Sequence, residues 1–211
     1  SKWKIIMAIT YPLTPPTSPR VQSIIFTAMN RVAVTESPFT YSTQSQAFAG
    51  QRWAADVTLP PMRREQAAQW VSFLVSLRGS FGDFLLGNPM ACVARGVGGG
   101  SPVVSGASQT GSDLNITGAT ASTTGWLKAG DYIQLGASGT ARLHQVLQDA
   151  NTDGSGATTL TLWPHVQSPV DSSVVIYVNP VGKFKLSSPD TSWSIDSMAV
   201  YGLTFSAKGV V

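Results

Sequence analysis

The sequence has very few of the residues that usually build catalytic or metal sites. It contains one cysteine, Cys92, and two histidines, His144 and His165. A single cysteine excludes an intramolecular disulfide, and neither histidine stands at metal-ligand spacing from another histidine, a cysteine or an acidic cluster. No G-x-S-x-G, Walker or H-E-x-x-H motif occurs. We therefore expect no catalytic residue, no metal site and no cofactor, and the sequence predicts a protein that is not an enzyme.

Charge and long apolar runs are also scarce. Charged residues make up 12% of the chain, about half the usual share for a soluble domain. Hydrophobic residues reach 43%, which is enough for a core, but no run approaches transmembrane length, so no membrane insertion is expected. The run at residues 5–9 is too short for a signal peptide, and residues 3–9 are predicted to form a first strand. Low charge with much Gly, Ser and Thr favours β-structure that is partly covered by other subunits.

The little charge that is present divides the chain into two parts. Residues 97–178 carry two basic and five acidic side chains, a net charge of −3, whereas the rest carries twelve basic and six acidic side chains, a net charge of +6. A glycine-rich segment, residues 95–102, stands at one boundary, and Asn179-Pro180 stands at the other. The sequence predicts a discontinuous domain of residues 1–96 and 179–211 with an inserted module of residues 97–178. Both boundaries should then lie close together in space.

The one convincing helix signal lies within residues 60–87. Pro60 and Pro61 suit the first turn of a helix, where a missing backbone N–H costs least. Apolar residues then recur at helical spacing, and Gly79 is a natural stop. The stripe consists of Ala67, Trp70 or Val71, Leu74 and Leu77. We expect this helix to cover one face of a sheet.

The remaining residues favour strands. The proline-rich segment 11–19 is predicted to run extended over the surface, and residues 20–30 and 31–35 are predicted strands. Residues 39–49 and 51–59 are predicted to pair as a hairpin that turns at Gly50. Further strands are expected at residues 81–86, 182–188, 191–196 and 198–209. Six short strands at roughly ten-residue spacing in the insert suggest a small barrel or sandwich, at residues 103–105, 113–116, 132–135, 143–147, 158–162 and 174–178.

The insert offers the sharpest local motif. Asp149, Asn151 and Asp153 match the opening of a calcium loop, but the closing acid is replaced by Leu160 and neither flank is helical. A polar hairpin turn is therefore favoured, and weak ion binding is the alternative. Aromatic rings such as Trp126 and Trp163 fill the core of the insert or, if exposed, stack on sugars. A carbohydrate-binding accessory module for attachment to a host surface is thus the alternative function.

Residues 37–89 resemble distal tail proteins, minor tail proteins of long-tailed, siphovirus-type bacteriophages. The resemblance depends on a G-x-x-W pair, a strand that ends in Pro-Pro-Met, an Arg-bearing helix with Trp70, and a G-x-F-x-L-G-[ND]-P motif. The residues are Gly50 and Trp53, then Gly82, Phe84, Leu85, Gly87, Asn88 and Pro89. Residues 127–136, 143–164 and 182–188 are similar to the middle module of such proteins.

The resemblance implies a mainly β, tail-tube-like sandwich or rolled sheet flanked by one helix, with an inserted barrel-like module. It implies a homo-hexameric ring at the virion tail tip, assembled in the host bacterial cytoplasm, with a lumen through which DNA only passes. The expected partners are the tail tube protein, the tape measure protein and the baseplate hub or tail fibre proteins. The expected subunit contacts are Arg63, Arg64, Trp70, Tyr11, Pro15 and Pro16. Tube lumens are often acidic, whereas the ring-forming domain of residues 1–96 and 179–211 is basic, and the sequence does not place its cations.

Overall fold

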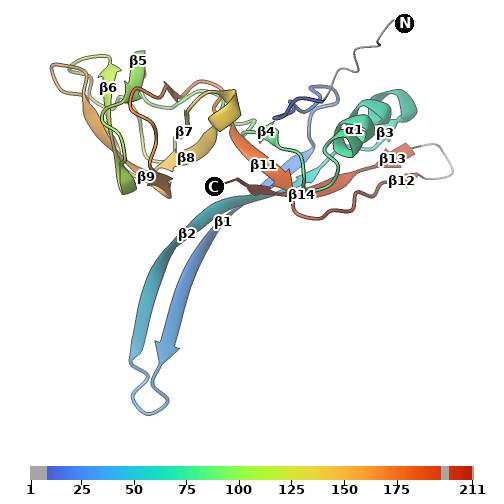
Figure 1. The fold of residues 1–211 in the computed structure, drawn as a ribbon, viewed down its shortest axis with the longest axis horizontal. Coiled ribbons are helices and arrows are strands. Elements are labelled where there is room, and N and C mark those ends of the chain that lie inside the picture. Colours follow the sequence, from blue (N-terminus) through green and yellow to red (C-terminus); the bar gives the residue numbers. More distant parts are fainter. Residues whose placement is uncertain (1–8, 196–199, 211) are drawn as a thin grey trace, which may run out of the picture.

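The structure is a computed structural model that describes residues 9–195 and 200–210. It is mainly β, with three sheets and, among the described residues, one α-helix, α1 (Arg64–Ser76) (Figure 1). The predicted fold class is therefore confirmed. Residues 1–8 lie outside the described residues, and with them most of the strand predicted at residues 3–9. Within the described part of the chain, no helix is long and apolar enough to cross a bilayer.

A five-stranded antiparallel sheet forms the body of the protein. Its order is β1-β2-β14-β11-β4, so strands from before and after the insert pair with each other. The strands are β1 (Ser23–Glu36), β2 (Thr43–Thr58), β14 (Thr204–Gly209), β11 (Gly182–Leu186) and β4 (Phe84–Leu86). Alternate residues are buried, for example Trp53, Ala55 and Val57 of β2 and Phe184 and Leu186 of β11. This pattern gives the sheet one apolar face, which we call the core face.

Helix α1 lies on the core face, as the apolar stripe predicts. Its buried residues are Ala67, Trp70, Phe73 and Leu74, while Val71 is half-buried. The helix begins at Arg64 and not at the Pro-Pro pair, because the short strand β3 (Met62–Arg63) intervenes and pairs with β13 (Val200–Gly202). A third short strand, β12 (Ser194–Ile195), completes this small sheet. Gly79 follows the helix with a φ of +66° and leaves no room for a Cβ against Pro189, which explains the stop.

The predicted hairpin turn at Gly50 is wrong. β2 runs without interruption through this position, and its hairpin partner is β1, with the turn at residues 37–42. The two strands predicted at residues 20–30 and 31–35 are accordingly one strand. The register jumps from Asn30 opposite Gln51 to Arg31 opposite Phe48, so Ala49 and Gly50 form a bulge. A glycine inside a strand marks a bulge as readily as a turn, and the alternating residues on both sides favour one long strand.

The insert folds into a nearly closed, six-stranded barrel. All six predicted strands are present, in the order β10-β7-β8-β9-β6-β5, and a bridge between Val103 and Val174 brings the two ends of the sheet together. A fully buried Trp126 packs among the aliphatic side chains inside. A short 3-10 helix, η1 (Ser138–Thr140), links two of the strands. The strands are β5 (Gly100–Val104), β6 (Thr110–Ala119), β7 (Tyr132–Leu135), β8 (Arg142–Val146), β9 (Thr158–Gln167) and β10 (Val175–Ile176).

The two connections between body and barrel lie side by side, as predicted. Val93 and Val178 form an antiparallel bridge, and the backbone N–H of Asn179 donates to the Cys92 carbonyl at 2.6 Å. The glycine-rich segment is not a free hinge. The Asp131 carboxylate, 4% exposed, accepts the backbone N–H groups of Arg95 at 2.8 Å and Gly96 at 3.1 Å, at the start of this segment. The entry to the barrel is therefore fixed by a buried carboxylate.

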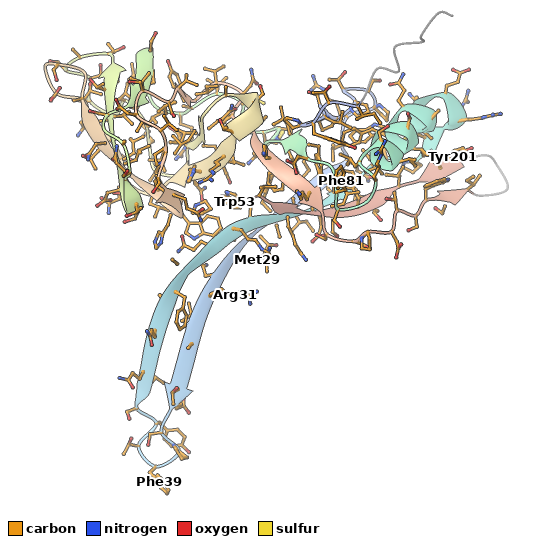
Figure 2. All side chains as sticks on the ribbon, viewed as in Figure 1. Met29, Arg31, Phe39, Trp53, Phe81 and Tyr201 are labelled. Atoms are coloured by element: carbon orange, nitrogen blue, oxygen red, sulfur yellow. The ribbon has the colours of Figure 1, made fainter. Side chains whose placement is uncertain are left out.

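An aromatic cluster joins the barrel to the core face of the sheet. The ring of Trp53 lies 4.5 Å from that of Trp163 and 5.9 Å from that of Tyr132. The Trp53 Nε1–H also donates to the Leu143 carbonyl at 2.9 Å. Both parts thus pack as one unit around Trp53, which Figure 2 shows between the sheet and the barrel.

Candidate functional site

A long two-stranded hairpin projects from the body. The outer halves of β1 and β2 leave the other strands and end in a loop at residues 37–42 (Figure 1). β14 pairs with β2 at Ala54–Thr58, so residues 43–53 of β2 pair with β1 alone. We call residues 31–48 the arm. Since β1 is also an edge strand, both sides of the arm present unpaired backbone groups, which are templates for pairing with another chain.

Both faces of the arm carry exposed apolar side chains. Val32 and Val34, 52% and 65% exposed, share one face with their opposite residues Ala47 and Ser45. Phe48, 51% exposed, lies opposite Arg31 on the other face, next to glutamine and threonine side chains. Every residue in the strands of the arm is exposed. A hairpin of two strands is marginally stable by itself, so the exposed strands of the arm gain little stability from their own contacts.

The tip of the arm holds two aromatic rings in solvent. Phe39 is 92% exposed and Tyr41 is 77% exposed (Figure 2). The loop is ordered by backbone hydrogen bonds from the Ser37 N–H to the Ser42 carbonyl at 3.0 Å and from the Tyr41 N–H to the Ser37 carbonyl at 2.9 Å. Tyr41 adopts a φ of +54°, an unusual conformation for an aromatic residue. Such rings are typical anchors of protein interfaces.

The root of the arm is fixed by the barrel. The Trp163 Nε1–H donates to the Asn30 Oδ1 at 2.8 Å, and the His165 backbone N–H donates to the Gln51 Oε1 at 2.9 Å. Asn30 and Gln51 flank the bulge, so both strands are held where they leave the body. Hydrogen bonds from the barrel therefore fix the direction in which the arm leaves the body.

The opposite edge of the sheet is covered by the chain itself. Leu13 lies along β4 and exchanges two backbone hydrogen bonds of 2.9 Å with Asp83 and Leu85. The proline-rich segment thus runs over the surface, as predicted. Tyr11 is half-buried, and its hydroxyl donates to the Ser76 carbonyl at 2.7 Å, so its role as a subunit contact stays a prediction. Pro15 and Pro16 are half-buried, and their role in subunit contacts stays a prediction.

Three subunit contacts were predicted in and beside the helix, namely Arg63, Arg64 and Trp70. Trp70 is 1% exposed and belongs to the core, so its prediction as a subunit contact is wrong. Arg63 and Arg64 are exposed and form no ion pair within the described residues. They stand at the N-terminus of α1, where the helix dipole disfavours cations. Their contact with another subunit stays a prediction.

The aromatic residues predicted for sugar binding are not free to stack. Trp126 is 0% exposed, and its Nε1–H donates to the Gly99 carbonyl at 3.0 Å. Trp163 is half-buried, with its ring against Trp53. The prediction of sugar stacking by Trp126 is therefore wrong, and the core interpretation holds. The ring of Trp163 serves the junction between barrel and body.

The polar turn of the insert, which contains Asp149, Asn151 and Asp153, holds neighbouring loops by hydrogen bonds. Asp149 accepts the Ala129 N–H at 2.8 Å, and Asn151 accepts the Gly125 N–H at 2.7 Å. Asp153 accepts the hydroxyl and backbone N–H of Ser155 and the backbone N–H of Ala157, and these donors lower its pKa. Within the described chain, no group of three or more His, Cys, Asp or Glu residues is placed to hold a metal ion. The favoured turn interpretation accounts for all three side chains.

Sequence reasoning missed the arm, which is the most distinctive surface of the molecule. The available signal was the pair Val32 and Val34 on either side of the small Ala33, followed by a Ser-Pro turn signal at Ser37. Comparison with models of protein families and with curated proteins finds no match for this chain.

Proposed function

We propose that this chain is a structural virion protein that forms a ring at the distal end of a phage tail tube. The ring joins the tube to the baseplate hub or tail tip and leaves a lumen for DNA. The resemblance of residues 37–89 to distal tail proteins supports this proposal, together with the mainly β fold and its single helix. The same resemblance implies a hexamer located in the virion. It also implies the partner proteins, namely the tail tube, tape measure and hub or fibre proteins.

The observation that carries the proposal is the asymmetry between the two sides of the sheet. Leu13 covers the β4 edge, whereas β1 and the outer part of β2 are open and project away from the body. A ring needs a heterologous interface, in which one surface of each copy meets a different surface of the next. An arm with exposed Val32 and Val34 on one side of the molecule provides one half of such an interface.

A carbohydrate-binding function is not favoured by the geometry. Its main support was the pair of insert tryptophans, and Trp126 is enclosed while Trp163 packs on Trp53. The barrel instead contributes to the proposed assembly by fixing the root of the arm through Asn30 and Gln51.

Removal of the arm tests the proposal directly. Arg31 and Phe48 are directly opposite, so an Asn-Gly turn can join them in place of residues 32–47. Because none of the removed residues belongs to either core, the shortened protein should keep its melting temperature within about 3 °C. It should also lose the oligomer that light scattering detects for the full chain.

A point variant with a matched control sharpens this test. Val34→Asp should weaken assembly, because the substitution places a charge on the apolar face of the arm. Val170→Asp changes a valine of similar exposure in the barrel, 73% against 65%, and should leave assembly intact. Full assembly of the shortened protein would refute the role of the arm.

A further inference from the structure

The sheet face opposite the core is basic. Residues that alternate with buried positions point to this side, and five of them are cationic. Arg31 stands at the root of the arm, Arg52 follows in β2, Lys208 lies in β14, and Lys183 and Lys185 lie in β11. We call these five residues the basic stripe. They are five of the twelve basic residues that lie outside residues 97–178.

The cations of the stripe are crowded together. Lys185 lies directly opposite Lys208, and Lys208 lies opposite Ala54, two residues from Arg52. Arg31 and Arg52 line the same surface hollow, at the bulge near Met29. Like charges directly opposite each other in a sheet destabilise it, so this arrangement is unfavourable in the isolated chain.

The stripe is compensated only in part. The Asp83 carboxylate forms ion pairs with the Nζ atoms of Lys183 and Lys185, at 3.3 and 3.5 Å. Asp56 accepts a hydrogen bond from the Ser206 hydroxyl. Arg31, Arg52 and Lys208 form no ion pair within the described chain, and an anionic partner would relieve their repulsion.

The positive surface continues into the hollow between the sheet and the barrel. Arg52 and Lys183 line this hollow together with Arg142, His144 and His165, and no acidic residue lines it. His144 is 3% exposed, and its Nε2 has no hydrogen-bond partner. A concave, acid-free surface with three cations attracts anions from solution.

We propose that the basic stripe binds the phosphate backbone of a nucleic acid duplex. Adjacent strands are about 4.8 Å apart, so Arg52, Lys208 and Lys185 span about 10 Å across three strands. A duplex presents about six phosphate charges over that length. Exposed hydroxyl residues accompany the cations, including Thr27, Thr204 and Ser206, and such side chains commonly bind phosphates.

The surroundings of the stripe favour a nucleic acid over an acidic protein. Around Arg52, Lys208 and the two lysines of β11, the large aromatic residues Trp53, Phe184 and Phe205 belong to the opposite, core side, so this part of the stripe lacks the anchors that protein interfaces usually have. The exposed ring of Phe48 lies only at the arm end, opposite Arg31. The inference goes beyond the proposed ring, because passage of DNA through a lumen requires no binding surface. It also applies to the chain in any oligomeric state.

Fluorescence anisotropy with a labelled 20-base-pair duplex tests the inference. The three unpaired cations are replaced together in the full chain, as Arg31→Gln, Arg52→Gln and Lys208→Gln. Each phosphate contact changes affinity by about 3.5-fold between 50 and 200 mM salt. The fall in affinity over this salt range should therefore be about 40 times smaller for the triple variant than for the unsubstituted chain. Its affinity at 50 mM salt should also fall.

The matched control removes three exposed cations that lie outside the stripe. Arg20→Gln, Arg78→Gln and Lys128→Gln change the net charge by the same amount and should bind like the unsubstituted chain. Equal weakening in both triple variants would overturn the site, as would the absence of duplex binding at 50 mM salt. Equally good competition by polyglutamate would overturn the nucleic acid assignment in favour of an acidic protein. Light scattering on the same samples reports oligomerisation separately, so failure of the ring and failure of this site are distinguishable.

Discussion

The buried histidine of the barrel makes the protein sensitive to acid in a way that can be calculated. His144 is 3% exposed, and its Nδ1–H donates to the Pro164 carbonyl at 2.8 Å, because a carbonyl only accepts. Protonation would place a second N–H at Nε2, which has no hydrogen-bond partner within the described residues, and would bury a charge near Arg142. Burial is the largest cause that lowers its pKa from 6.5 to about 4.

The sign of the effect follows from proton binding. Between pH 6.5 and about 4, the unfolded chain binds a proton at this residue that the folded chain does not bind. The free energy of unfolding therefore falls as the pH is lowered through this window, and it is unaffected by this group above the window. A difference of about 2.5 pKa units corresponds to a loss of about 3 kcal/mol.

Urea unfolding at several pH values between 7.5 and 4 measures this loss. His144→Asn retains a side-chain donor and removes the titrating group, so its free energy of unfolding should fall by about 3 kcal/mol less over the same range. Groups such as Asp153, whose lowered pKa also makes stability fall with acid, are present in both proteins and cancel. Identical pH profiles for His144→Asn and the unsubstituted protein would refute the reasoning.

Three further substitutions test the core and the junctions. Asp131→Ala should lower the free energy of unfolding by about 2–4 kcal/mol in urea titrations, because it leaves three backbone N–H groups at the barrel entry without their acceptor. Gly82→Ala should lower the free energy of unfolding by about 1–3 kcal/mol in the same titrations, because the added Cβ would collide with the Tyr11 ring. Gly139→Ala is the control and should be nearly neutral, because its Cβ would enter open space. Trp126→Ala should cost about 3–5 kcal/mol and change no signal on a glycan array, and a stable variant with altered glycan binding would revive the carbohydrate hypothesis.

The parts of the fold that depend on local periodicity were predictable from the sequence. The spacing of Ala67, Trp70 and Leu74 predicted the helix and its buried face, and Gly79 predicted its end. The six strands of the insert were predicted because polar turns separate them at regular intervals. The proximity of the two insert boundaries followed from the topology that an inserted domain requires.

The projection of the arm away from the body was not predictable from local patterns, because it depends on pairing between distant residues. Gly50 is compatible with both a turn and a bulge, and the choice is made by the register of β1 against β2. Exposure of Val32 and Val34 is equally nonlocal, since the same alternation is typical of a strand that buries one face. The basic stripe required the sheet order, because residues 52, 185 and 208 are far apart in sequence.

Electron microscopy of the purified full chain at high concentration tests the central claim most directly. The proposal predicts closed rings of identical copies, six in number, around an open centre, with the hairpin arm of each copy on its neighbour. A homogeneous population of single chains under the same conditions would contradict it.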